Sequence, residues 1–469
     1  MKVYKRLKNY NDKIALILDN GETYSYRNVL KKSNLLSNFF FEREIVFLLV
    51  DNNLESILAL IACDIKNSVV MLLPSKIDKL ALNNLIKSYN PKIIFSKTIS
   101  KIKHKNFIKK KNYYDYEILI NKNNTYKIKN DSLFLLLSTS GSTGSAKNVK
   151  ISHENLIFNT TSIIKSLKIH SLNRCITTMP LNYVYGLSII NTHLFSGAST
   201  VLTSYSFFQK EFWQILKKYK VNNFGGVPYN YEILSKIGLK EDKLKTIKYF
   251  TQAGGHMDEK TKKILFNFCL KTNKKLFVMY GAAEATARMS ILQWDDLKTK
   301  FDSIGKPLIN CEFDLINSKG KKILKPNTTG ELVFKGNNVF KGYAKKFLDL
   351  NKIENIQKLK TGDLGYFDNE GFYYIVGKKS RYIKLAGNRI SLDEIEKILK
   401  RVKIDSICTQ NLKDKIDVYI NIKPKKIDIK DYISKKLNLN KIFFEIFLIK
   451  KFPRNKNNKI NYSSKILKR

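Results

Sequence analysis

Short apolar runs alternate with helical patterns from the N-terminus to Tyr280. The runs at 45–50, 69–73 and 133–137 have the length of buried strands, whereas 56–63 has helical spacing. Further runs of β type occur at 176–180, 199–203 and 275–280, and each ends in a polar or glycine turn. Strands and helices in alternation predict a layered α/β fold with mainly parallel sheets.

The pattern changes after Cys311. Two runs of β type, 313–316 and 331–334, are separated by glycine and proline turns and predict a small β subdomain. Further on, Ser391 and Glu394 form a capping box before an apolar helix face. A compact α+β module is then completed by alternating apolar positions from 418, a helix near 430–437 and an apolar run at 442–448. The basic stretch 101–112 is expected to be a solvated loop or helix face.

A loop of glycines, hydroxyls and one lysine follows the apolar run at 133–137, and it extends from Ser138 to Lys147. Glycines let backbone N–H groups approach an anion, hydroxyls donate further hydrogen bonds, and the lysine adds a positive charge. A helix with Ser152 as its N-cap is expected to follow. The loop fits neither the Walker A spacing nor Gly-x-Gly-x-x-Gly. A flexible linker is the alternative interpretation, but a linker seldom follows five consecutive apolar residues.

Four further motifs follow this loop along the chain. They are Tyr-Gly-Ala-Ala-Glu at 280–284, Thr-Gly-Asp at 361–363, a Gly-Lys-Lys-Ser-Arg segment that continues to Gly387 and Ile390, and Pro-Arg-Asn-Lys-Asn-Asn-Lys-Ile at 453–460. With the loop, they resemble in order the motifs of the acyl-adenylate-forming (AMP-binding) superfamily, which includes bacterial acyl-CoA synthetases, peptide-synthetase adenylation domains and beetle luciferases. The resemblance extends over about two-thirds of the chain.

The resemblance implies a large N-terminal layered α/β adenylate-forming domain, residues 1–379, with a small β subdomain. It also implies a small α+β C-terminal lid, residues 380–469, that swings about Ser380. The implied reaction is that of an acid–thiol ligase, which converts a small-molecule carboxylic acid and ATP to an acyl adenylate and pyrophosphate and then transfers the acyl group to coenzyme A. ATP, Mg²⁺ and coenzyme A are the cofactors expected.

The resemblance assigns roles in nucleotide binding to particular residues. Those implied to hold the β- and γ-phosphates are Thr139, Ser140, Gly141, Ser142, Thr143, Gly144 and Lys147. Glu284, in the motif that starts with Tyr280 and Gly281, is expected to ligate Mg²⁺, which prefers hard oxygen ligands.

Three further residues are implied to contact the nucleoside. Gly254 and Gly255 match the loop on the adenine side, where missing side chains let the base lie against the backbone. Asp363 is expected to accept hydrogen bonds from both ribose hydroxyls, for which an ionised carboxylate is suited.

Two lysines of the C-terminal module are implied to act in separate steps. Lys459 would bridge the carboxylate and α-phosphate oxygens during adenylation, and Lys384 would serve thioester formation after the lid rotates. Gly387 would line the entry of the thiol.

Four positions depart from the motifs of the superfamily. Ala146 stands in place of proline, Ala283 in place of threonine, Lys378 in place of arginine and Tyr183 in place of histidine at the substrate gate. Lys378 keeps the charge but loses the bidentate fork of a guanidinium. We expect these changes to affect rate and the second step more than nucleotide binding.

Two other functions stay open at this stage. The acyl or aminoacyl group could be loaded onto the phosphopantetheine of a carrier protein instead of coenzyme A, or the chain could be a nucleotide-binding protein with weakened catalysis. An amino acid substrate is disfavoured because the Phe-Asp-x-Ser segment of peptide-synthetase domains has no counterpart near 182–188.

Composition and charge limit the classes of protein that the sequence is compatible with. With 469 residues, 43% of them hydrophobic, the chain can bury a large core and form more than one domain. The formal net charge is +45, but the lysines are spread along the whole sequence. The charge therefore reflects either a general compositional bias or a surface that attracts anionic substrates or an acidic carrier protein, and no specific nucleic acid is expected.

The five cysteines are widely spaced, without Cys-x-x-Cys, which argues against a zinc site and against a disulfide framework. No apolar run approaches the roughly 18 residues needed to span a bilayer. The basic N-terminus is not followed by an apolar signal core. A cytoplasmic location without a membrane span is the expectation.

Overall fold

The computed structural model describes residues 2–97, 106–124, 126–138, 147–352, 354–385, 388–411, 415–422, 424, 427–437, 439–454, 460–462 and 464–467. They form two compact units. The first comprises the described residues up to 138, 147–312 and 334–359, and the second comprises those of 313–333 and 360–469. The boundary predicted between residues 379 and 380 concerns a moving lid, and it stays a prediction.

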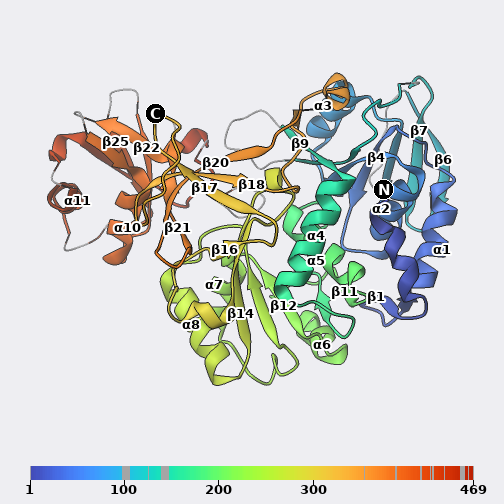
Figure 1. Cartoon of the computed structure of the whole chain (residues 1–469), viewed down its shortest axis with the longest axis horizontal. Coiled ribbons are helices and arrows are strands. Elements are labelled where there is room, and N and C mark those ends of the chain that lie inside the picture. Colours follow the sequence, from blue (N-terminus) through green and yellow to red (C-terminus); the bar gives the residue numbers. More distant parts are fainter. Residues whose placement is uncertain are drawn as a thin grey trace. The chain divides into compact units, whose positions relative to one another are not determined.

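One sheet of the first unit has eight strands, of which β4, β6, β7 and β9 are labelled in Figure 1. Their spatial order is β19 (Tyr343–Ala344), β9 (Asn148–Ser152), β8 (Leu133–Ser138), β4 (Val69–Pro74), β3 (Ile45–Val50), β5 (Ile93–Lys97), β7 (Tyr116–Asn121) and β6 (Phe107–Tyr113). The four central strands β8, β4, β3 and β5 are parallel, and their residues are almost all buried. Continuous apolar runs are typical of parallel strands that are covered on both faces.

The other sheet of the first unit has nine strands. Their order is β16 (Lys306–Pro307), β15 (Ser290–Leu292), β14 (Lys275–Tyr280), β13 (Tyr249–Gln252), β12 (Asn223–Gly226), β10 (Arg174–Ile176), β11 (Ser199–Leu202), β1 (Ile14–Leu18) and β2 (Thr23–Ser25). The six strands from β14 to β1 are parallel. Their carboxyl ends therefore lie along one edge, where open α/β sheets place their ligands.

Helices connect the strands of both sheets. Those of the first unit are η1 (Val3–Tyr10), α1 (Tyr26–Ser37), α2 (Leu54–Lys66), α3 (Lys79–Tyr89), α4 (His153–Leu167), α5 (Val184–Phe195), α6 (Lys210–Lys218), α7 (Pro228–Ile237), α8 (Glu259–Lys271), η3 (Ala283–Ala285), α9 (Trp294–Leu297) and η4 (Phe347–Asn351). Helices α4 and α5 pack against each other (Figure 1). Ser152 caps α4 as predicted, because its side chain accepts a hydrogen bond from the Asn155 N–H at 3.1 Å.

The second unit contains a four-stranded sheet and a smaller α+β module. The sheet has the order β17 (Glu312–Ile316), β18 (Gly330–Lys335), β20 (Lys358–Phe367) and β21 (Tyr373–Lys378). The module consists of η5 (Lys379–Arg381), β22 (Tyr382–Leu385), β23 (Asn388–Ser391), α10 (Leu392–Arg401), β24 (Ser406–Gln410), β25 (Ile416–Ile420), α11 (Ile429–Leu437), η6 (Lys441–Phe443), β26 (Phe444–Leu448) and η7 (Lys465–Leu467). Buried apolar residues of β22 to β26 and of both α-helices form its core.

These elements confirm the predicted α/β fold class, with its β subdomain and α+β module. The prediction for 101–112 was wrong over its second half, because Phe107–Tyr113 forms β6, which pairs antiparallel with β7. An edge strand tolerates lysines that point to solvent, so its basic composition concealed it. Within the described residues, no helix has the length and apolar character needed to cross a bilayer, and all five cysteine thiols are buried and unpaired.

Candidate functional site

Two neighbouring parallel strands of the nine-stranded sheet, β13 and β14, end in the segments that carry predicted site residues. Gly254 and Gly255 follow β13, and Gly281 directly follows Tyr280 at the end of β14. Because β12, β13 and β14 are paired in register, these segments lie at one edge of the sheet. The fold thus brings the predicted adenine loop and the Tyr-Gly motif side by side.

Two of these glycines leave no room for a side chain. A Cβ on Gly281 would lie 1.8 Å from the Ala287 carbonyl oxygen, so only glycine fits where the chain turns back along β15. Gly254 has φ +89°, and a Cβ there would lie 2.7 Å from the hydroxyl of Tyr183. Tyr183, at the predicted substrate gate, therefore lies against the predicted adenine loop.

Lys147 and Glu284 both lie next to Tyr343. The Tyr343 hydroxyl donates a hydrogen bond of 2.8 Å to Glu284 Oε1, and Lys147 Nζ lies 5.6 Å from the centre of the Tyr343 ring. Burial and the nearby Glu284 carboxylate raise the pKa of Tyr343 above its ordinary value, so the phenol remains a donor. The structure therefore brings together a cation, a carboxylate and a hydroxyl that the motifs alone did not connect.

Strand pairing explains this arrangement. Tyr343 lies in β19, opposite Val149 of β9, and Lys147 directly precedes β9. Sequence reasoning missed Tyr343 because the pairing of β19 with β9 is long-range, and no local pattern near Tyr343 signals it.

The backbone around Glu284 is fixed by buried amide and hydroxyl groups. The Phe340 N–H donates to the Glu284 carbonyl at 2.9 Å, and the Asn338 side chain donates to the Ala285 and Arg288 carbonyls at 2.9 Å each. Thr286 Oγ1 donates to the Asn338 carbonyl at 2.7 Å. These bonds hold the Glu284 segment against residues 338–343, which orients the Glu284 carboxylate without any contribution from a ligand.

In the second unit, Asp363 and Lys378 form an ion pair. The two residues are opposite each other in the β20–β21 ladder, and Lys378 Nζ lies 2.8 Å from Asp363 Oδ1. The turn before Asp363 is held by Thr361, whose hydroxyl accepts from the Asp363 N–H at 3.1 Å and donates to the Leu332 carbonyl at 2.8 Å. Asp363 is largely buried whereas Lys378 is exposed, so the carboxylate is the better fixed member of the pair.

Arg381, one residue after the predicted hinge at Ser380, is held on all sides within the second unit. Its Nε lies 2.7 Å from Asp393, its Nη1 donates to the Cys408 carbonyl at 2.6 Å, and its Nη2 bonds Glu396. These carboxylates raise the pKa of Arg381 against the effect of burial. Arg381 therefore ties η5 to α10 and β24 within the module.

Several predicted residues lie outside the described part of the chain. They are Thr139, Ser140, Gly141, Ser142, Thr143 and Gly144 of the phosphate loop, Gly387, and Lys459. Lys384 lies in β22, where its backbone is opposite that of Arg389 in β23.

The described residues that flank these segments are nevertheless paired. Ser138 donates to the Asn148 side chain at 2.9 Å and pairs with it in the β8–β9 ladder, directly beside the predicted phosphate loop. Arg454 forms an antiparallel bridge with Ile460, and the Asn461 N–H donates to the Pro453 carbonyl at 2.9 Å. The described residues at the ends of both segments are therefore held by their own pairs.

Comparison with known proteins identifies a matching family and related CoA ligases. The sequence pattern of the family described as AMP-binding enzyme matches residues 3–344. The 2-succinylbenzoate–CoA ligase of Oceanobacillus iheyensis is 25% identical, with 97% of this chain and 96% of the relative aligned. The oxalate–CoA ligase of Saccharomyces cerevisiae is 28% identical over 70% of this chain and 61% of its own length.

Solved structures show the same fold. The O-succinylbenzoate coenzyme A synthetase of Bacillus subtilis in complex with AMP has a TM-score of 0.78 and 22% identity, covering 98% of each chain. ATP-bound MatB of Rhodopseudomonas palustris has a TM-score of 0.81 and 18% identity, covering 100% of each chain.

Proposed function

Because the chain belongs to the AMP-binding enzyme family, we propose that it is an ATP-dependent, AMP-forming acid–thiol ligase. It activates a carboxylic acid as an acyl adenylate, releases pyrophosphate, and transfers the acyl group to coenzyme A. The observation that carries the proposal is the arrangement of Lys147, Tyr343 and Glu284. This arrangement lies in a unit whose nine-stranded sheet also carries the Gly254 loop and the Tyr280 motif at its carboxyl edge.

The residues around Glu284 fit a magnesium nucleotide. Within the described residues, no group of three or more histidine, cysteine or acidic side chains could hold a metal on its own. Mg²⁺ needs no such group, since it is commonly bound by one or two carboxylates together with substrate phosphates and water. Glu284 would supply the carboxylate, with its orientation set by Tyr343, and the ion would offset phosphate charge.

The remaining residues of the first unit would position the substrates. Lys147 would neutralise phosphate charge at the end of the predicted loop, and Gly254 would let the adenine base approach the backbone. Tyr183 would close the acid pocket next to Gly254. Its hydroxyl occupies the space that a side chain at residue 254 would need. Such positioning and charge stabilisation supply most of the catalysis expected for phosphoryl chemistry.

Residues of the second unit would act on the nucleoside and the reacting groups. Asp363, fixed by the Thr361 turn, would accept hydrogen bonds from the ribose hydroxyls. Lys459 would stabilise the charge that develops during adenylation, and Lys384 and Gly387 would serve transfer to the thiol. Gly255, Gly281 and Lys378 would also contribute to binding of the nucleotide.

The decisive experiment measures pyrophosphate release from ATP and Mg²⁺ over a panel of carboxylic acids, with and without coenzyme A. We expect release that depends on one class of acid, and a thioester only when coenzyme A is present. Glu284→Gln should raise the Mg²⁺ concentration needed for half-maximal rate, whereas Glu312→Gln, at a largely exposed glutamate of the same unit, is the matched control. ATP binding without release for any acid would instead indicate a nucleotide-binding protein with weakened catalysis.

The same assay tests the acceptor and partner. Replacement of coenzyme A by an acidic carrier protein with a phosphopantetheine arm would identify carrier loading if only the carrier were acylated. The net charge of +45 favours an encounter with an acidic carrier at low salt. We place the enzyme in the cytoplasm, where ATP and coenzyme A are supplied.

A further inference from the structure

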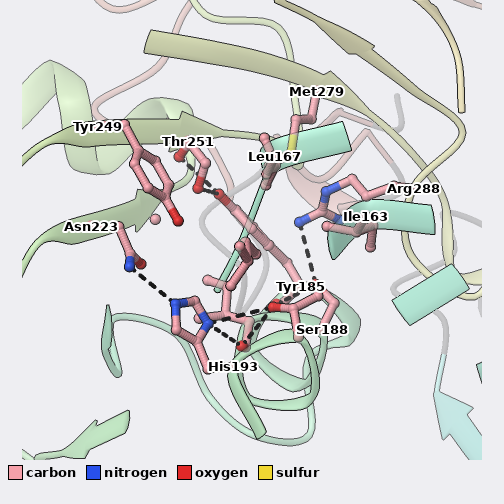
Figure 2. A pocket seen from close by; sticks show the side chains of 14 residues that line it. Ile163, Leu167, Tyr185, Ser188, His193, Asn223, Tyr249, Thr251, Met279 and Arg288 are labelled. Carbon is pink, nitrogen blue, oxygen red and sulfur yellow. Dashed lines mark hydrogen bonds between the residues drawn. The ribbon is translucent and has the colours of Figure 1, made fainter. Parts of the chain in front are cut away.

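A small buried cavity lies in the first unit, between helices α4 and α5 and the nine-stranded sheet (Figure 2). The volume open to the centre of a water molecule is about 20 Å³, which is space for about one or two waters. Helix α5 contributes Tyr185, Ser188 and His193, strand β13 contributes Thr251, and Arg288 lies just before β15. The cavity is therefore too small for a long alkyl chain, but it can admit a compact polar group.

Arg288 is a buried cation that its neighbours only partly satisfy. Its side chain is buried, with the guanidinium carbon 4.0 Å from the centre of the Tyr185 ring. Nη1 donates to the Ala287 carbonyl at 3.2 Å and Nη2 to Ser188 Oγ at 3.5 Å, but Nε has no hydrogen-bond partner. Burial lowers the pKa of Arg288, yet a guanidinium remains protonated at neutral pH.

An unpaired buried charge is destabilising, and its retention needs an explanation. None of the side chains that line the cavity carries a carboxylate. The aromatic face of Tyr185 offsets part of the cost of burial, but a ring face cannot accept all the N–H groups of the fork. The structure thus holds a positive charge and an unused donor at a cavity that has no anion of its own.

His193 does not supply a second positive charge there. Its Nδ1 lies 2.8 Å from the Ile189 carbonyl and its Nε2 lies 3.0 Å from the Asn223 amide nitrogen, so the ring donates to one and accepts from the other. Burial lowers the pKa of His193 to about 4, and the imidazole is neutral near pH 7. Arg288 is therefore the charged residue that faces this cavity.

The cavity adjoins the segments that the proposed reaction uses. Arg288 follows Glu284 by four residues, Thr251 precedes Gly254 by three, and Tyr185 follows Tyr183 by two. The backbone of Arg288 is anchored, because its carbonyl accepts from Asn159 at 2.8 Å. A substrate whose reacting end lay near Tyr183 could therefore reach Arg288 with its other end.

We propose that the acid substrate carries a second carboxylate, and that Arg288 binds this distal group in the cavity. The inference rests on the proposed function, since it concerns the acid that the ligase activates. Ser188 would share the anion, because its hydroxyl lies beside Nη2 and can turn from its present bond with the Tyr185 carbonyl. A charge-assisted pair with the guanidinium explains why arginine rather than an apolar residue closes the pocket.

The test compares symmetrical dicarboxylic acids, aliphatic and aromatic, with their monomethyl esters and with monocarboxylic acids of the same length. Pyrophosphate release is measured for the wild type, Arg288→Gln and Arg288→Lys. We expect the wild type to prefer one dicarboxylic acid over its monomethyl ester by about 10- to 100-fold in kcat/KM, the scale of a hydrogen bond to a charged group. Arg288→Gln should remove this preference and leave the KM for ATP unchanged, and Arg288→Lys should keep part of it.

The outcomes separate the inference from the proposed function. Wild-type activity with monocarboxylic acids or monoesters equal to that with dicarboxylic acids would overturn the inference alone, and this comparison needs no variant to fold. Equal loss for every acid in Arg288→Gln would reduce Arg288 to a structural partner of Tyr185 and would also overturn it. Absence of release with any acid would overturn the proposed function and the inference with it.

Discussion

The buried histidine of helix α5 makes the stability of the first unit depend on pH. Both ring nitrogens of His193 are satisfied only when the imidazole is neutral, because Nε2 must accept the bond from Asn223. Protonation would turn that acceptor into a donor that faces another donor, at a buried position. We therefore expect acidification to destabilise the wild type more than a variant that lacks His193.

The direction and size follow from the pKa of His193, which burial lowers from 6.5 to about 4. The unfolded chain takes up a proton near pH 6.5 whereas the folded chain does so only near pH 4, so the unfolded state binds more protons between these values. The contribution of His193 to the free energy of unfolding is fully present above pH 6.5, and it is lost as the pH falls from 6.5 towards 4. The free energy of unfolding falls by about 3 kcal/mol in total, and about 2 kcal/mol of this loss has occurred at pH 5.

The measurement is urea unfolding of the wild type and His193→Gln at pH 7.5 and pH 5. His193→Gln should be less stable at pH 7.5, but its loss on acidification should be smaller than that of the wild type by about 2 kcal/mol. His256→Gln, at an exposed histidine, is the control and should follow the wild type. An NMR titration of the His193 side chain tests the pKa directly. Equal pH dependence in the wild type and His193→Gln would refute the reasoning.

Three further predictions concern the proposed site. Lys459→Ala should lower carboxylate-dependent pyrophosphate exchange by about 10²-fold or more while ATP binding persists, and near-normal exchange would contradict the role of Lys459. Asp363→Ala should weaken ATP and AMP binding in calorimetry by about 1.5–3 kcal/mol; a 2′,3′-dideoxy nucleotide should bind both proteins about equally, and unchanged ATP binding would make Asp363 a turn residue. Ser380→Pro and Lys384→Ala should spare adenylate formation in a single turnover but slow its decay on addition of coenzyme A. Equal slowing of both steps would argue against two orientations of the module.

The parts of the fold that sequence could predict are those with a local signal. The apolar run before Ser138 and the cap at Ser152 correspond to β8 and α4, since burial and capping act within a few residues. The strand at Phe107–Tyr113 was missed because both of its faces are largely exposed, so apolar alternation was weak. Its pairing with β7 supplies the stability that its own residues do not show.

In the candidate site, too, the sequence could predict only the features that have a local signal. Glycines and acidic residues in the motifs could be recognised because backbone approach and charge restrict the residue types that serve. Tyr343 and Arg288 could not, since their roles depend on which strands become neighbours and on the direction of one side chain. Tyr343 reaches Glu284 across 59 positions of sequence. Residue type alone does not distinguish Arg288 from the many basic residues on the surface.

The hairpin that carries the predicted phosphate loop has an electrostatic consequence. Ser138 pairs with Asn148 and Leu133 pairs with Ser152, so the loop and the start of α4 lie at opposite ends of β8. Five residues of strand separate Lys147 from Ser152 by about 17 Å. The macrodipole of a helix acts on anions only near its first turn, so that of α4 contributes little to a phosphate held by the loop. If the proposed function is correct, Lys147, the hydroxyls and amides of the predicted loop and Mg²⁺ would supply that attraction, and nucleotide affinity should therefore weaken with ionic strength more than in proteins whose phosphate loop opens directly into a helix.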